Sequence, residues 1–150
     1  VNRGYWDINF VTWWTLQENG ITLFGQNANE LPLQITWSQV EETMRYNLHH
    51  YWNERVSRTE TLYDAVDVAD AILTLCRIHF TLIEKKILPK VQAGKKFIMD
   101  DKLSRWIPLV TEAVSIRERL STTNDCANPE KRAADTVEFI KYMINSYKEY

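Results

Sequence analysis

Two positive charges occupy positions in this sequence that suit the binding of an anion. Arg77 interrupts the largely apolar segment 71–78, and Lys90 directly follows Pro89. A proline is common at the first position of a helix, where free backbone N–H groups and the helix dipole attract anions. A guanidinium can bind a phosphate through two parallel hydrogen bonds, and a lysine adds a full charge. These residues form a candidate polyanion site, although Arg77 can equally be a structural arginine paired with a carboxylate.

Three acids precede Arg77 at intervals of three residues: Asp64, Asp67 and Asp70. This spacing keeps side chains near one face of a helix. The acids are therefore either solvated or form a patch that binds a cationic ligand. Asp67 is expected to lie on the same side of this helix as Arg77, further along the binding cleft. The following segment 85–102 contains six lysines against two aspartates, which indicates either a solvated helix face or more positive charge near the anion site.

Other site chemistries have less support in the sequence. The three histidines, His49, His50 and His79, lack the spacing of a zinc site, and the chain has only four glycines with which to build a phosphate-binding loop. We expect no metal ligands and no catalytic residue in this chain. Arg45 and His50 have a spacing similar to that of small helical ribonucleases. An autonomous helical module, either such a ribonuclease or a ligand sensor, is therefore the alternative function.

The composition narrows the class of protein. A chain of 150 residues that is 45% hydrophobic and 25% charged is expected to fold with a substantial core. The formal net charge of −2 argues against a general nucleic-acid binder. Two cysteines do not make a disulfide framework, so we expect a reducing cytoplasm. There is no apolar run of membrane-span length and no signal peptide, so no membrane partner is expected.

The elements that must position these residues are helical. Apolar spacing predicts helices over 7–19, 38–56, 61–84, 89–99, 103–120 and from 129 onward. We predict an all-α fold, a bundle of about five to six helices, with a strand or short extended segment near residues 21–25. The segment 69–83 is apolar on nearly all sides and belongs at the centre of the bundle.

Local signals predict where several helices begin and end. Asp7 and Asn128 are expected N-caps, and Ser38 with Glu41 has the spacing of a capping box. Gly20 is expected to end the first helix in the left-handed conformation. The apolar start of the chain at Val1 suggests a piece of a longer protein.

Three stretches carry a resemblance to a known family. They are 72–78 (Ile-Leu-Thr-Leu-Cys-Arg-Ile), 86–90 (Lys-Ile-Leu-Pro-Lys) with Ala93, and 108–113 (Pro-Leu-Val-Thr-Glu-Ala). They resemble the C-terminal helical domain of the aminoglycoside nucleotidyltransferases, in particular the streptomycin/spectinomycin adenylyltransferases. Residues 19–25 look like the linker that follows the family's catalytic domain.

The resemblance implies a division of labour between two domains. In this family, an N-terminal nucleotidyltransferase domain binds ATP and Mg²⁺ through a Gly-Ser motif and paired acids, and this sequence contains no Gly-Ser dipeptide. Residues 1–35 then correspond to a linker helix and extended segment, and residues 36–150 to the helical nucleotide- and substrate-binding domain. The parent protein is expected to be a cytoplasmic antibiotic-resistance enzyme that transfers an adenylyl group to a drug hydroxyl. The chain alone is expected to bind neither ATP nor Mg²⁺ and to be inactive.

The resemblance also implies roles for individual residues. Arg77 and Lys90 match the triphosphate contacts of the family, and Asp67 matches an acid that meets the aminoglycoside. Asp70 stands where relatives often have His or Asn near the substrate. Arg117 stands where the adenylyltransferases have a Tyr near the nucleotide, and its guanidinium can contact the nucleotide in place of that Tyr.

Overall fold

The computed structural model describes residues 9–119 and 128–148. Within these ranges the chain contains helices and no strand, which confirms the predicted all-α class. The α-helices are α1 (Phe10–Asn19), α2 (Trp37–Asn47), α3 (Asn53–Val56), α4 (Ala65–Glu84), α5 (Lys90–Ile98), α6 (Ile107–Arg117) and α7 (Pro129–Ser146). A π-helical segment, Leu48–Trp52, joins α2 to α3 without a break, so these elements make six helical segments in the described ranges.

The chain forms two compact units, Val1–Tyr46 and Asn47–Tyr150. All five predicted site residues lie in the second unit. The domain division predicted from the resemblance, after residue 35, stays a prediction, because a compact unit need not coincide with a family domain.

In the first unit, α1 has different caps from those predicted. Asn9 is its N-cap and accepts a hydrogen bond from the Thr12 backbone N–H at 3.0 Å, whereas Asp7 lies outside the described residues. The helix ends at Asn19 as predicted, but Gly20 has φ −66° and is not left-handed. Glycine is required there for space, because a Cβ atom would lie 2.3 Å from the Leu16 carbonyl oxygen.

The segment after α1 is non-helical, but it forms bends and no strand. Leu23, Phe24 and Gly25 lie in these bends, and Gly25 has φ +91°, a conformation that favours glycine. Strand pairing needs a neighbouring strand to satisfy the backbone, and none is present among the described residues.

The capping box of α2 lies two residues before the predicted one. The Thr36 backbone N–H donates to Gln39 Oε1 at 2.9 Å, and the Gln39 N–H donates to Thr36 Oγ1 at 3.4 Å. The predicted box of Ser38 and Glu41 is therefore wrong, because Thr36 and Gln39 have the same spacing and reach the helix start first. The predicted end of this helical stretch at Val56 is confirmed.

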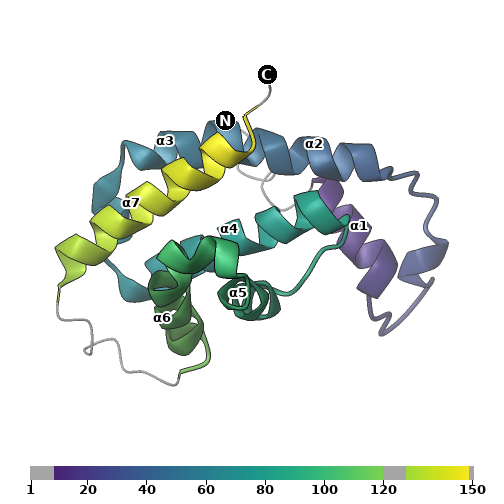
Figure 1. The fold of residues 1–150 in the computed structure, drawn as a ribbon. Coiled ribbons are helices and arrows are strands. Elements are labelled where there is room, and N and C mark those ends of the chain that lie inside the picture. The colour runs from purple at the N-terminus through teal and green to yellow at the C-terminus, as the bar shows by residue number, and fades with distance from the viewer. Residues whose placement is uncertain (1–8, 120–127, 149–150) are drawn as a thin grey trace. The chain divides into compact units, whose positions relative to one another are not determined.

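In the second unit, α4 is the central helix. It packs against α5 and α6 on one side and against α7 on the other (Figure 1). Its buried side chains come from nearly all sides of the helix, as the apolar segment 69–83 predicted. The predicted start near Thr61 is wrong, because Thr59–Leu62 is a 3₁₀ turn and α4 begins at Ala65.

Close packing brings α5 against its neighbours. A Cβ atom on Gly94 would lie 2.5 Å from Leu73 Cδ2 of α4 and 2.8 Å from Val114 Cγ2 of α6. A larger side chain would push α5 away from both helices. Gly94 therefore sets the distance between the elements that carry the candidate site.

The remaining helix starts follow their prolines and caps. Asn128 accepts a hydrogen bond from the Lys131 N–H at 3.0 Å, and Pro129 opens α7, as predicted. The predicted fifth helix begins with a 3₁₀ segment, Asp101–Trp106, so that α6 starts at Ile107 with Pro108 in its first turn. No helix within residues 9–119 and 128–148 combines the length and apolar character needed to cross a membrane.

Candidate anion-binding site

Helix α4 places Asp70 and Arg77 on nearly the same face. They are seven residues apart, which is roughly two turns at about 3.6 residues per turn. The helix is held at its N-terminus by Asp64, whose carboxylate accepts from the Val66 N–H at 2.8 Å and the Asp67 N–H at 3.0 Å. Both side chains therefore project from a buried and well-capped scaffold.

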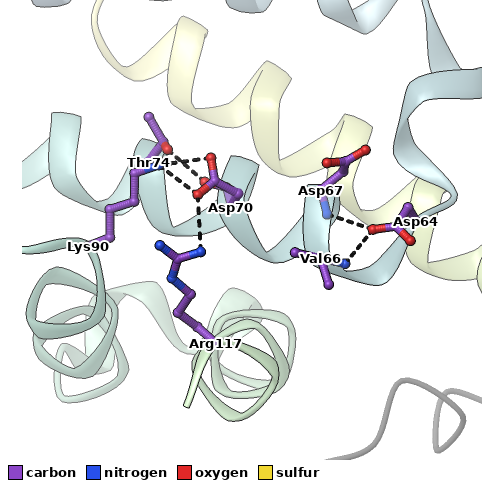
Figure 2. A network of polar contacts seen from close by, with 7 residues as sticks. All are labelled: Asp64, Val66, Asp67, Asp70, Thr74, Lys90 and Arg117. Atoms are coloured by element: carbon purple, nitrogen blue, oxygen red, sulfur yellow. Dashed lines mark hydrogen bonds and ion pairs between the residues drawn. The ribbon is translucent and has the colours of Figure 1, made fainter. Parts of the chain in front are cut away.

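Helix α5 brings Lys90 to Asp70. Pro89 is the N-cap of α5 and Lys90 is its first residue, one position later than the predicted start. The Lys90 ammonium group donates to both carboxylate oxygens of Asp70, at 2.7 and 2.8 Å (Figure 2). The Lys90 side chain is 24% exposed and that of Asp70 is 44% exposed, so the pair lies at the protein surface.

Helix α6 contributes a second cation at its C-terminal residue. Arg117 Nη1 lies 3.9 Å from Asp70 Oδ1, which is a long ion pair (Figure 2). The Arg117 side chain is 49% exposed. Three helices therefore meet at one carboxylate, and two of them deliver positive charge to it.

Arg77 adds a third cation close to this group. Burial lowers the pKa of its guanidinium, and the negative charge of Asp70 raises it. The guanidinium stays charged near neutral pH, because arginine is too strongly basic to lose its proton in a protein. Its Nε is buried with no hydrogen-bond partner, and no ion pair to Arg77 occurs in the described part of the chain. Arg77 therefore has no ion pair of its own among the described residues, and the carboxylate whose charge acts on it is that of Asp70.

We call Asp70, Arg77, Lys90 and Arg117 the α4–α6 charge cluster. It holds three cations against one carboxylate, so its positive charge is only partly neutralised. Ammonium and guanidinium groups carry only N–H donors, and these suit the oxygens of a phosphate. The residues therefore fit a phosphate group.

The three acids of α4 have three different environments. Asp64 caps the helix, and Asp70 accepts from Lys90 (Figure 2). Asp67 is exposed, and its carboxylate makes no hydrogen bond or ion pair with any described residue. The predicted patch is thus divided, and Asp67 is the member of the three that stands open to a cationic ligand.

The sequence did not predict that Asp70 would pair with Lys90 and lie near Arg117. Asp70 was a candidate substrate contact. In the structure its carboxylate accepts hydrogen bonds from Lys90, a predicted phosphate-binding residue 20 positions later in the chain. The only signal for it was its shared face with Arg77. Two of the lysines that follow, Lys95 and Lys96, pair with Glu118 and Glu84, as expected for a solvated face.

Arg45 and His49 make polar contacts elsewhere in the chain. Arg45 pairs with Glu41 at 3.0 Å, and His49 Nε2 lies 3.1 Å from the Tyr147 carbonyl oxygen. His50 belongs to the π-helical segment. Within residues 9–119 and 128–148, no group of three His, Cys, Asp or Glu side chains is arranged to hold a metal ion.

The buried cysteine of α4 is not a reactive thiol. Burial raises the pKa of Cys76, partly offset by a backbone hydrogen bond that lowers it. The thiolate is the reactive form, so this residue belongs to the core and not to a site.

Comparisons with known proteins cover the range that contains the charge cluster. The family described as "Aminoglycoside adenylyltransferase, C-terminal domain" matches residues 38–146, a range that includes the whole charge cluster. A spectinomycin 9-adenylyltransferase from Campylobacter jejuni is 29% identical over 132 residues, which cover 87% of this chain and 46% of the relative. The chain thus spans less than half the length of the curated relative that it matches. No solved structure matches the chain.

The matched range contains both Arg45 and His50, so it places the ribonuclease-like pair inside this family as well. Since the match extends over more than half of the chain, it settles the family to which the charge cluster belongs. The chain belongs to the family of aminoglycoside adenylyltransferase C-terminal domains.

Proposed function

We propose that this chain supplies the triphosphate and substrate contacts for adenylyl transfer from ATP to a hydroxyl group of an aminoglycoside or similar compound. The observation that carries the proposal is the convergence of Lys90 and Arg117 on Asp70, two turns from the unpartnered Nε of Arg77. The name of the relative, spectinomycin 9-adenylyltransferase, supports the choice of reaction and of substrate class.

The reaction needs positive charge where the leaving group forms. The substrate hydroxyl attacks the α-phosphorus of ATP, and the bond to the bridging oxygen breaks as pyrophosphate leaves. Negative charge grows on the pyrophosphate, and fixed cations that meet it lower the barrier. Lys90 and Arg77 are proposed to bind the β- and γ-phosphates, with Arg117 nearer the edge because it is half exposed.

Mg²⁺ supplies further charge neutralisation when it is bound with ATP. The described residues contain no group of three side chains suited to hold it. We therefore propose that its ligands belong to an N-terminal nucleotidyltransferase domain of the complete protein, which is the partner of this chain. The catalytic base is proposed to lie there too, so this chain contributes binding and charge and not proton transfer.

The decisive test is the substitution Lys90→Ala in the complete protein. If Lys90 stabilises the developing charge on pyrophosphate, kcat/KM for ATP falls by roughly 10²-fold while substrate binding changes little. Steady-state kinetics with ATP and spectinomycin measure both. The matched control is Lys102→Ala, which removes an exposed lysine outside the charge cluster and should leave the kinetics unchanged. Equal losses in the two variants would refute the proposed role.

A further inference from the structure

We propose that Asp70 is an internal competitor for the phosphate site: it occupies Lys90 and Arg117 when no anion is bound, and it lowers the affinity of the site for polyphosphate. This inference rests on the proposed function, because it assumes that the charge cluster binds phosphate. It goes further by assigning Asp70 to the control of nucleotide affinity, a part that differs from the substrate contact implied by the resemblance.

The geometry shows that Asp70 and a phosphate compete for the same donors. An ammonium group has three N–H donors, and Lys90 directs two hydrogen bonds to the two oxygens of one carboxylate, at 2.7 and 2.8 Å. Arg117 Nη1 approaches the same carboxylate at 3.9 Å (Figure 2). A phosphate that binds Lys90 through more than one oxygen must therefore displace Asp70.

The ion pair is exposed enough to be displaced. Nearly half of the Asp70 side chain and a quarter of the Lys90 side chain remain accessible to solvent, and pairs at such positions contribute little to stability. A polyphosphate offers several oxygens and more than one negative charge, so it can take over both cations. Asp70 therefore neutralises part of the positive charge when no ligand is bound, and the site stays accessible to solvent.

Asp70 continues to oppose the anion after displacement. It lies within the long helix α4, so its backbone cannot move away, and its carboxylate stays near the bound phosphate. Like charges at short distance repel, so the cost of binding includes both the lost ion pair and this repulsion. Replacement by the uncharged isostere Asn removes both costs and should tighten polyphosphate binding by about three- to tenfold.

The experiment is calorimetry on the complete protein with inorganic tripolyphosphate and, separately, with ATP. It compares the unaltered protein with Asp70→Asn and, as a second variant, Asp70→Ala. Circular dichroism verifies that each variant is folded. Tighter binding of both ligands by both variants is the expected result.

The chain offers a closely matched control in Glu84→Gln. Glu84 is also an α4 carboxylate paired with an α5 lysine, Lys96, but it lies 14 residues further along the helix. That separation is roughly 21 Å at about 1.5 Å per residue. The control removes the same charge from the same pair of helices, and it should leave polyphosphate affinity nearly unchanged. An equal gain in both variants would overturn the proposal, since it would reflect net charge alone.

A double-mutant cycle tests whether the competition is for Lys90 itself. If it is, the gain from Asp70→Asn shrinks in a Lys90→Ala background. A gain of the same size in that background contradicts competition for Lys90.

Weaker binding by Asp70→Asn would show that Asp70 organises Lys90 for the ligand, and unchanged binding would show that Asp70 does not compete with it. Either result overturns the inference but leaves the proposed phosphate site intact. If neither the unaltered protein nor the variants bind tripolyphosphate, the phosphate site and the inference both fall.

Discussion

Three aspartates on or beside one helix have different roles in this protein. Asp64, Asp67 and Asp70 are evenly spaced on or beside α4, yet one caps the helix, one is open to solvent and one accepts from Lys90. A carboxylate already satisfied by backbone N–H groups or by an ammonium has less to offer a ligand. The open carboxylate of Asp67 is therefore the acid of this helix most suited to a cationic substrate.

At this scale we predict that Asp67→Asn in the complete protein weakens aminoglycoside binding roughly tenfold, the cost of losing one charge-assisted hydrogen bond. ATP binding should change little, because Asp67 makes no contact with the charge cluster among the described residues. Calorimetry with each ligand measures both affinities. Equal losses for drug and nucleotide, or no loss for either, would mean that Asp67 is only a solvated acid near a helix start.

At the scale of elements, packing between α4 and α7 encloses a histidine. The Tyr147 hydroxyl at the end of α7 lies 2.6 Å from His79 Nδ1, and the ring of His79 meets Phe97 edge-on, with centroids 5.7 Å apart. Burial lowers the pKa of His79 below its ordinary value of 6.5, while the charges of Asp100 and Glu84 oppose this shift. The folded protein therefore favours the neutral ring.

This packing predicts a pH dependence of stability. When the pKa is lower in the folded state, the unfolded chain binds a proton first as the pH falls. The contribution of neutral His79 is complete above about pH 6.5 and is lost as the pH falls through the folded pKa, with a slope of at most about 1.4 kcal/mol per pH unit. Urea unfolding at several pH values between 7.5 and 5 measures it. The His79→Gln variant should have a flatter profile, and an unchanged profile would contradict the assignment.

At the scale of the whole molecule, the chain has a complete helical core but only part of the length of its relative. The second compact unit, Asn47–Tyr150, has α4 enclosed by three other helices, while the chain covers 46% of the spectinomycin 9-adenylyltransferase. Folding and catalysis are thus expected to separate. The core can form from these residues, whereas the proposed reaction also needs ligands for Mg²⁺, and no group of three suitable side chains occurs among the described residues.

We therefore predict that the purified 150-residue chain folds cooperatively with a helical circular dichroism spectrum but transfers no AMP. The physical reason is that fixed cations can bind a triphosphate, but adenylyl transfer also requires metal coordination and a base to activate the hydroxyl. Transfer of radiolabel from ATP to spectinomycin or streptomycin provides the assay. The complete protein is the positive control, and detectable transfer by the chain alone would contradict the prediction.

The sequence by itself determined what depends on near neighbours along the chain. Helix α7 opens at Asn128 and Pro129 as predicted, because a cap acts on backbone groups within one turn. The apolar segment 69–83 predicted the central position of α4, since a helix that is apolar all round must be enclosed. Local patterns were ambiguous where two of them overlapped, as with the capping boxes that begin at Thr36 and Ser38.

Only the tertiary structure decided which charges meet. Lys90 reaches Asp70 across 20 residues because α5 packs closely on α4, an approach that the missing side chain of Gly94 permits. Arg117 reaches the same carboxylate because α6 ends beside it, and burial leaves the Arg77 Nε without a partner. Spacing along one helix determines which residues share a face, but it carries no information about the neighbouring helix that the face meets. The candidate residues could therefore be read from the sequence, whereas the position of Asp70 among three cations could not.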